Sequence, residues 1–346
     1  MKKQNGFWRI TFDTNPNDCN LHCIMCEHHS QYSNVEKSRI AMGKPKQRMP
    51  IALIKHVLER AKNSGLKEII PSTMGEPLLY RDFEKILDLC TEYDVKLNLT
   101  TNGTFPMKGV KEWAEKIVPI ATDVKISWNG STKRTQEKIM RGTNFETGIN
   151  NIKEFLEIRN LYAENVNNYC RVTLQLTFME ENLCELVDIV KLGIKLGVDR
   201  IKGHHVWTHF QETKSSSLRK NPESIARWNQ VVIEAQQVAN NNPLANGKKI
   251  LLENFIVLDE RAMVRLLPNS VCPFLGKEAW IAADGHFSPC CAPNDQRQLL
   301  GDFGNVHEKN IDEIWHDSEY QNLCKNYTKH PVCIACNMRK AINEAS

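Results

Sequence analysis

The chain of 346 residues has no long apolar run, no strong charge of either sign and no low-complexity linker. No segment approaches twenty apolar residues, and no charged stretch followed by an apolar one opens the sequence. These absences exclude the usual patterns of a membrane span and of a secretory signal. The formal net charge of +4 is too small to indicate a polyanionic partner, and no basic RNA-binding module is visible. We therefore predict a cytoplasmic protein without a nucleic-acid or membrane partner.

Cysteine, by contrast, is abundant, with 12 residues. In a chain without a secretion signal, thiols point to metal or thiol chemistry rather than to disulfides. Cys19, Cys23 and Cys26 show the spacing C-x3-C-x2-C, shortly after the strand-like run at residues 7–12. Three thiolates leave one iron of a four-iron cluster open, and an open iron binds and activates a small molecule. A zinc site remains the alternative, because C-x2-C is common in zinc sites.

From residue 50 onward, helix-period and strand-period segments alternate, as in a parallel sheet with crossover helices. The expected strands are residues 7–12, 68–70, 95–99, 124–126, 172–178 and 201–206. Six units are too few for a closed eight-stranded barrel. Chemistry in such folds sits at the carboxyl ends of the strands, where the Cys19 loop follows the first strand.

The cysteine spacing resembles that of the radical S-adenosylmethionine (SAM) superfamily. The resemblance implies an α/β fold, a partial (β/α)6 TIM-type barrel. It also implies a [4Fe-4S] cluster whose free iron chelates the amino and carboxylate groups of SAM. One electron then splits SAM into methionine and a 5′-deoxyadenosyl radical.

The end of the second expected strand resembles a SAM contact of that family. The segment Met74-Gly75-Glu76-Pro77 resembles the Gly-Gly-Glu-Pro turn that receives the SAM ammonium group, with Met74 in place of the first glycine. Glu76 can accept hydrogen bonds from an ammonium, and Gly75 permits close backbone approach. An ordinary turn is the alternative.

Further cofactor-binding candidates come from the resemblance: Met25, Asn102, Ser127 and Arg141. Met25 occupies the position that lies near adenine in relatives. Asn102 ends the third expected strand, Ser127 is a candidate contact for the SAM ribose or carboxylate, and Arg141 for the carboxylate. A turn or surface role stays open for Asn102, Ser127 and Arg141, since Asn-Gly pairs are standard turn formers.

The last 75 residues carry a second cysteine pattern, with Asp284-Gly285 marking a hairpin between apolar runs. Its four metal-ligand candidates are Cys272, Cys290, Cys333 and Cys336. A C-x17-C with a distant C-x2-C can close one four-thiolate site. The pattern resembles the C-terminal SPASM domain, especially its shortened Twitch form, which implies one auxiliary [4Fe-4S] cluster. A structural zinc is the alternative.

Five cysteines lie outside these two patterns. Cys90, Cys170 and Cys184 fall in apolar segments and are expected to pack in the core. Cys291 and Cys324 are catalytic candidates, as spare thiols near the cavity, or are packing residues. Spare thiols matter because, in Twitch-bearing relatives, a cysteine that returns hydrogen gives epimerisation, whereas electron loss to the auxiliary cluster gives dehydrogenation.

Histidines and aromatic residues crowd the end of the sixth expected strand, within residues 204–210. His205 and His209 are catalytic candidates, because an imidazole can take a hydroxyl proton and aromatic faces suit a sugar ring. Aromatic packing with a satisfied histidine is the alternative. Only about six residues precede the first strand, so we expect no leader-binding module and a small substrate.

We predict a radical SAM oxidoreductase that abstracts hydrogen from a sugar, aminocyclitol or similar small molecule, with an external electron donor such as flavodoxin or ferredoxin. A peptide-modifying radical SAM enzyme and a non-catalytic iron-sulfur or zinc protein are the alternatives. The expected parts are a barrel at 1–215, a connection at 216–271 and the auxiliary cluster domain at 272–346.

Overall fold

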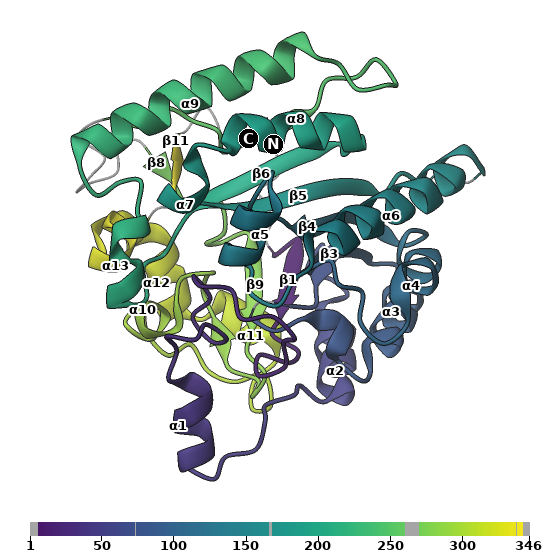
Figure 1. Cartoon of the computed structure of the whole chain (residues 1–346). Helices are drawn as coiled ribbons and strands as arrows, with labels where there is room; N and C mark the ends of the chain where they lie inside the picture. The colour runs from purple at the N-terminus through teal and green to yellow at the C-terminus, as the bar shows by residue number, and fades with distance from the viewer. Residues whose placement is uncertain (1–5, 73, 166–167, 260–269, 337, 342–346) are drawn as a thin grey trace. The chain divides into compact units, whose positions relative to one another are not determined.

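A computed structural model describes residues 6–72, 74–165, 168–259, 270–336 and 338–341. The chain divides into two compact units, one formed by residues 1–18, 45–98 and 264–346, the other by residues 19–44 and 99–263. Figure 1 labels the helices and strands of both. The expected division at residues 215 and 272 follows the order of the chain and stays a prediction. Part of the expected connection, residues 260–269, lies outside the described residues.

Unit 1 contains the start of the chain and the C-terminal cysteines. Its strands are β1 (Arg9–Phe12), β2 (Glu68–Ile70), the first half of β3 (Lys96–Thr101), β8 (Ser270–Val271), β9 (Glu278–Ile281), β10 (Phe287–Ser288) and β11 (Lys340–Ala341). Its helices are α2 (Ile51–Ala61), η1 (Pro77–Leu79), α3 (Phe83–Glu92), α10 (Asn294–Gln298), α11 (Ile311–His316), α12 (Ser318–Asn326), η4 (Tyr327–Lys329) and α13 (Pro331–Ile334). The hydrogen-bonded strand order is β10-β9-β1-β2-β3, and β11 pairs separately with β8.

The C-terminal segment of unit 1 shares a core with the first strand. Strand β9 runs parallel to β1, with Arg9 opposite Glu278. Phe7 contacts Trp315 of α11 with ring centroids 5.1 Å apart, and Tyr320 lies 5.1 Å from Trp315. These rings are nearly inaccessible to solvent, so their burial ties the C-terminal cysteines to the N-terminal strand.

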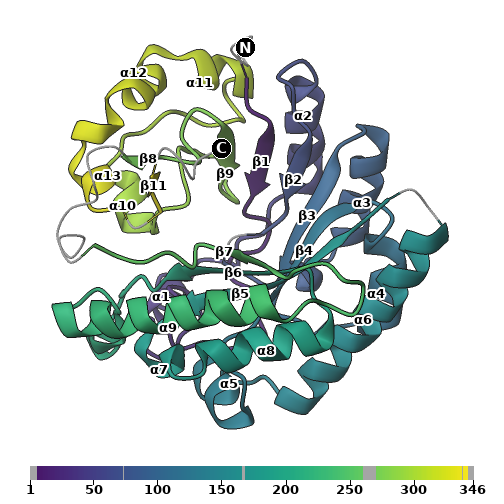
Figure 2. The same cartoon turned by 90° about the horizontal axis from the view of Figure 1, so that it is seen from above.

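Unit 2 contains the N-terminal cysteines and most of the parallel strands. Its strands are the second half of β3, β4 (Ala121–Ser127), β5 (Arg171–Phe178), β6 (Arg200–His205) and β7 (Leu251–Glu253), in that order. Its helices are α1 (Val35–Ala41), α4 (Gly109–Ile117), α5 (Lys133–Ile139), α6 (Phe145–Asn165), α7 (Glu180–Leu183), α8 (Leu186–Leu196), η2 (Gln211–Ser216) and α9 (Pro222–Asn241). Helices α8 and α9 lie together on one side of β5 and β6 (Figure 2).

The two faces of β6 differ in chemistry because side chains alternate along a strand. On the helix side, Ile201 is fully buried, and a Cβ on Gly203 would lie 2.1 Å from the ring of Phe178. On the other side, Arg200 donates to Glu253 at 2.8 Å and forms a salt bridge with Asp123. The polar face of β6 therefore carries Arg200, Lys202 and His204, and the apolar face carries His205.

The predicted mixed α/β fold with parallel strands is confirmed, and all six expected strands form. The sequence reading missed the parallel additions of β7 and β9. One packing prediction is wrong: Cys184 is exposed, because the expected single helix breaks between α7 and α8 and leaves it at the break. Cys90 and Cys170 are buried as expected. Among the described residues, no helix is both long and apolar enough to cross a membrane.

Candidate functional site

The N-terminal cysteine loop of unit 2 is anchored by its own apolar residues. Leu21 and Ile24 join a buried cluster with Ile139, Met140, Met179 and Val206, and Cys19, Cys23 and Met25 pack against it. Two backbone bonds hold the loop at the end of α5, from His22 N to Arg141 O at 2.8 Å and from Ile24 N to Ile139 O at 2.9 Å. Leu21 and Ile24 stand between the cysteines in the sequence, so the burial of these two side chains anchors the cysteine loop.

The three sulfurs of this loop lie close enough to affect one another. Burial first, and then the charges of Cys26 and Cys19, raise the pKa of Cys23 well above its usual range. Backbone N–H groups point at the other two sulfurs, from Leu21 to Cys19 at 3.5 Å and from His29 to Cys26 at 3.3 Å. Neighbouring buried thiolates are costly without a cation, so this donor set fits a cationic iron-sulfur cluster.

Asn102, directly after β3, lies beside this loop. Its Nδ2 donates to Cys19 Sγ at 4.0 Å and to Asn20 Oδ1 at 2.8 Å. Its Oδ1 accepts from the backbone N of Thr104 at 3.0 Å. Asn102, which the resemblance names as a SAM-binding candidate, thus lies beside a predicted cluster ligand, and its contact with SAM stays a prediction.

Arg141, Ser127 and Met25 also belong to unit 2. The exposed Arg141 donates through Nη1 to Gln31, a residue just beyond the third cysteine, and Met25 is half-buried against the apolar cluster. Ser127 ends β4 opposite Gln175 of β5, and Gln175 Nε2 lies 3.5 Å from His204 Nδ1. Gln175 and His204 thus add two polar side chains to the strand ends of unit 2. The sequence analysis did not select His204 as a site residue, although side-chain alternation along β6 could have indicated it.

The Gly75-Glu76 turn belongs to unit 1 and is held against the residues that precede Cys19 in the chain. Asn15 Nδ2 donates to Glu76 O at 2.8 Å, and Glu76 N donates to Asp18 O at 2.8 Å. The Glu76 side chain is buried, and its carboxylate accepts from Leu78 N at 3.2 Å. The Glu76 carboxylate therefore caps the N-terminus of η1. This is the role expected if the segment is an ordinary turn, the alternative given by the sequence.

Asp18 was missed by the sequence reasoning. Burial acts to raise its pKa, but hydrogen bonds and charge from Arg48 and then Lys46 outweigh burial and lower it. The ion pairs measure 2.7 Å to Arg48 and 3.0 Å to Lys46. They hold residues 46–48 beside Asp18.

His205 and His209 lie in aromatic surroundings in unit 2. The His205 ring centroid is 4.7 Å from that of Trp228 and 5.6 Å from that of Phe178. His209 contacts Phe210 at 6.0 Å, and Phe210 lies 6.0 Å from Tyr32 of the cysteine loop. Burial lowers the pKa of His205 to about 3 and that of His204 to about 4. The position of His205 matches the packing alternative, and its catalytic role stays a prediction.

The four C-terminal metal-ligand candidates line one cavity in unit 1. The cavity is lined by Cys272, Phe274, Leu275, Cys290, Cys291, Ala292, Leu300, Leu323, Tyr327, Val332, Cys333, Cys336, Met338 and Arg339. Burial, followed by the charges of Cys272, Cys336 and Cys333, raises the pKa of Cys290 to about 12, although a bond from the Ala292 backbone opposes this. The hairpin at Asp284-Gly285 forms as predicted, between β9 and β10.

This donor set fits an iron-sulfur cluster. Backbone N–H groups reach Cys272 Sγ from Leu275 at 3.3 Å and Cys336 Sγ from Met338 at 3.4 Å. Such donors stabilise thiolates around a cluster. The described residues hold no group of three or more His, Cys, Asp or Glu set for a single metal ion. The fit of this site to an iron-sulfur cluster is therefore argued from the type, number and burial of its sulfur donors.

The two catalytic thiol candidates lie in unit 1, one lining this cavity and the other near Cys272. Cys291 lines the cavity, where burial and then Cys290 raise its pKa well above its usual range. Cys324 lies on α12, and burial raises its pKa to about 11 although Tyr320 donates to it. Both thiols are thus neighbours of the auxiliary site.

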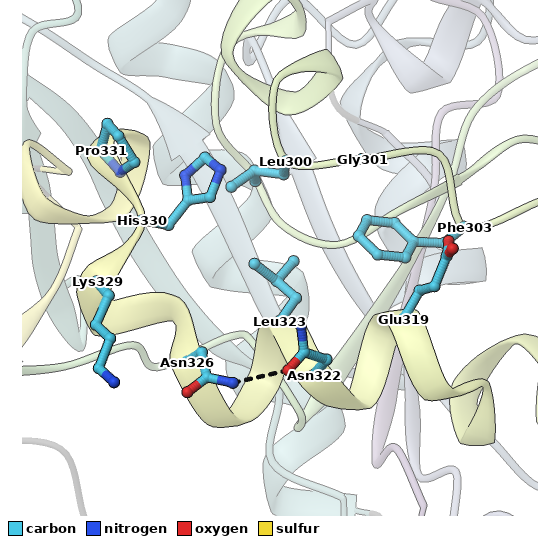
Figure 3. A pocket seen from close by; sticks show the side chains of 10 residues that line it. All are labelled: Leu300, Gly301, Phe303, Glu319, Asn322, Leu323, Asn326, Lys329, His330 and Pro331. Carbon is cyan, nitrogen blue, oxygen red and sulfur yellow. Dashed lines mark hydrogen bonds between the residues drawn. The ribbon is translucent and has the colours of Figure 1, made fainter.

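A second hollow in unit 1 lies beside this cavity. Its volume is about 470 Å³, and Leu300 and Leu323 line both spaces. Asn326 donates to Asn322, one turn earlier on α12, at 2.7 Å, and Lys329 and His330 also line the hollow (Figure 3). The two spaces thus share these two leucines as lining residues.

Comparison with known proteins agrees with both cysteine patterns. The family model of the radical SAM superfamily matches residues 16–193, and that of the SPASM iron-sulfur cluster-binding domain matches residues 272–337. A curated relative from Pyrococcus furiosus, described as a tungsten-containing aldehyde ferredoxin oxidoreductase cofactor-modifying protein, is 24% identical over 343 residues. That match covers 93% of this chain and 85% of the relative.

The fold is similar to that of SuiB from Streptococcus suis. Its structure with SAM has a TM-score of 0.65 at 16% identity and covers 92% of this chain and 68% of SuiB. Its structure with the precursor peptide SuiA has a TM-score of 0.64 at 17% identity and covers 93% and 68%. At these identities the likeness concerns the fold.

Proposed function

Since this chain belongs to the radical SAM superfamily, we propose that it is an oxidoreductase that abstracts hydrogen from a sugar, an aminocyclitol or a related small molecule. It is a radical SAM enzyme with a SPASM domain, and these domains imply a [4Fe-4S] cluster with SAM and auxiliary iron-sulfur binding. The reaction type and the substrate class are the proposed parts.

Cys19, Cys23 and Cys26 would hold the SAM-binding cluster. When bound, that cluster supplies the electron that splits SAM and starts radical chemistry. The chain's own residues position the reactants: Asn102 donates to Cys19, and Arg141 lies at the loop where a SAM carboxylate contact is expected. Gly75 allows the Glu76 backbone to approach the segment before Cys19, which orients the predicted ammonium site.

The convergence of four C-terminal cysteines on one cavity is the observation that carries the oxidation proposal. We count one auxiliary cluster there, held by Cys272, Cys290, Cys333 and Cys336. Removing a hydrogen atom from a carbinol carbon, then a proton from its hydroxyl group and one electron from the radical, gives a ketone, and the electron needs an acceptor. The curated relative's name, a cofactor-modifying protein, supports a small substrate.

Dehydrogenation and epimerisation need different groups from the protein. Dehydrogenation needs a proton acceptor, for which His205 and His209 are the proposed groups. Epimerisation needs a thiol that returns hydrogen, for which Cys291 and Cys324 are proposed. An external electron donor such as flavodoxin or ferredoxin would reduce the SAM-binding cluster.

A peptide substrate is the second candidate. The fold of SuiB in complex with its precursor peptide matches 93% of this chain, which favours testing peptides beside small molecules. In that case the same hydrogen abstraction would act on an amino-acid side chain or backbone carbon.

Isotope transfer separates these candidates. Anaerobically reconstituted protein is given SAM, dithionite and either a perdeuterated pool of sugars and cyclitols or a deuterated peptide digest. Deuterium in 5′-deoxyadenosine from the sugar pool supports the proposal, and deuterium from the digest alone supports the peptide alternative. The C19A, C23A and C26A triple variant is the control and should cleave no SAM. Retained cleavage in that variant contradicts the proposed cluster site.

A further inference from the structure

Arg339 lies three residues after Cys336 and lines the cavity of the four C-terminal cysteines. Among the described lining residues of that cavity, it is the only charged side chain. A guanidinium stays protonated at all ordinary pH values, so it brings a permanent positive charge to an otherwise apolar and thiol-rich space.

Four contacts hold the guanidinium in place. Its Nε and Nη2 donate to Ser270 O, the first at 3.2 Å, and its Nη1 donates to Cys333 O at 3.3 Å. Its Cζ lies 5.7 Å from the ring centroid of Tyr327, whose hydroxyl accepts from Cys272 N at 3.1 Å. The guanidinium group therefore contacts the backbone of Cys333 directly. It is linked to the backbone of Cys272 through the side chain of Tyr327.

The acceptors of Arg339 are neutral carbonyl oxygens. Across the described part of the chain, no carboxylate lies within ion-pair distance of it. Burial, and then the charges of Cys336 and Cys272, raise the pKa of Cys333 to about 11, whereas the charge of Arg339 acts in the opposite direction. Its charge also favours the thiolates of Cys272 and Cys336.

A cluster with four thiolate ligands is an anion, and one-electron reduction adds a further negative charge. A fixed cation beside it stabilises the reduced form more than the oxidised form, because Coulomb attraction grows with the anion's charge and is strong away from water. A cation at this place therefore raises the reduction potential and makes the cluster a better electron acceptor.

We infer that Arg339 is a positioning residue for the auxiliary cluster, where its charge raises the reduction potential and favours electron uptake. The inference rests on the proposed function, because it requires an iron-sulfur cluster at the four C-terminal cysteines. It also gives the C-terminal cysteine site a property, a raised reduction potential, that suits electron uptake from a substrate and that a purely structural site would not need.

The experiment measures the midpoint potential of the auxiliary cluster by an EPR-monitored redox titration. The full-length chain carries C19A, C23A and C26A, so that only the auxiliary cluster gives a signal. R339Q keeps hydrogen-bond donors without the charge, R339K keeps the charge without the planar fork, and K329Q removes an exposed charge that does not line the cavity. Iron per chain is measured for each protein.

At unchanged iron content, R339Q should shift the midpoint to a more negative potential. R339K should stay nearer to the parent protein than R339Q does, and K329Q should match the parent. An unchanged midpoint in iron-loaded R339Q overturns the inference. Zinc instead of iron in the parent protein overturns the proposed auxiliary cluster itself, so the two failures are distinguishable.

If R339Q takes up no iron, R339H tests the charge within one folded protein. Its midpoint should become more positive as the pH falls through the histidine titration, with a steeper pH dependence than the parent shows. Loss of iron in the Gln and His variants with retention in R339K makes the charge a requirement for holding the cluster, which supports the inference. Equal loss of iron in the Gln, His and Lys variants would show that Arg339 only holds the local structure together, and that result overturns the inference.

Discussion

The backbone at Gly75 lies so close to Asn15 that a Cβ on Gly75 would be 2.1 Å from the Asn15 carbonyl oxygen. The next-nearest atom, Asp18 O, would be 2.8 Å away. Both are backbone atoms and cannot rotate aside. The close approach joins the Gly-Glu turn to the segment that leads into Cys19, which gives the glycine of this motif a steric reason.

Gly75→Ala should therefore lower the free energy of unfolding by about 3 kcal/mol, the upper end for overpacking, and weaken SAM binding. Gly247→Ala is the control, because open space surrounds Gly247 and only its φ of +76° is strained. That strain costs about 1 kcal/mol. Urea denaturation of both variants checks the difference, and equal losses would contradict the steric account.

The half-buried His205 predicts a loss of stability in mild acid. Its pKa is lowered by burial to about 3 in the folded chain, against about 6.5 when unfolded. Between these values the unfolded chain binds more protons, so stability falls as the pH falls. At pH 5 the loss is about 2 kcal/mol relative to pH 7.

His205→Phe should remove that loss, so the variant should be less sensitive to pH than the wild-type protein. Urea midpoints at pH 7 and pH 5 give the comparison, and titration of other groups cancels in the difference. His307→Gln, at an exposed position, is the control for the loss of an imidazole elsewhere in the chain. A pH response of His205→Phe equal to that of the wild type would show that His205 titrates normally.

Asn102 should tune the SAM-binding cluster through its bond to Cys19 Sγ. Asn102→Asp replaces an N–H donor with an anion beside the sulfur, which disfavours the reduced cluster. We expect a more negative midpoint and about tenfold slower SAM cleavage, as for other groups that support a metal ligand. Thr104→Val is the comparison, since it removes the bond from Thr104 Oγ1 to Asn102 Oδ1 at 2.7 Å but keeps the N–H donor to the sulfur, and it should slow cleavage less. Unchanged cleavage in Asn102→Asp would remove Asn102 from the site.

The cysteines should differ sharply in their reaction with iodoacetamide in the metal-free protein. Cys184 is exposed and should react first at pH 8. Burial raises the pKa of Cys90 and of Cys170 to about 12, so both should react only after unfolding. Peptide mass spectrometry over time gives the order, and early labelling of Cys90 would contradict its burial.

The parts of the site that were predictable from sequence depend on local spacing. Cys19, Cys23 and Cys26 are close in sequence, and Asn102 was named because its strand end resembles that of the radical SAM superfamily. The alternation of side chains along β6 predicts that His204 and His205 lie on opposite faces of the sheet. Which face packs against helices is seen only in the structure, where the Phe178 ring lies against Gly203.

The parts that could not be predicted depend on distant contacts. The pairing of Arg9 with Glu278 joins residues at opposite ends of the chain, and no local pattern announces that β9 adds to β1. Arg339 likewise meets Ser270 across 69 positions of sequence. Cys184 was misplaced because leucine and valine spacing continued across the break between α7 and α8.

Metal content with SAM cleavage tests the central claim most directly, for the wild-type protein beside a C272A, C290A, C333A and C336A variant, both reconstituted anaerobically. The wild-type protein should hold about eight irons, four per cluster. In the variant, iron should halve while some SAM cleavage survives, which identifies an auxiliary cluster beside the SAM-binding one. Loss of zinc at constant iron would show a structural C-terminal site and contradict the proposed electron acceptor.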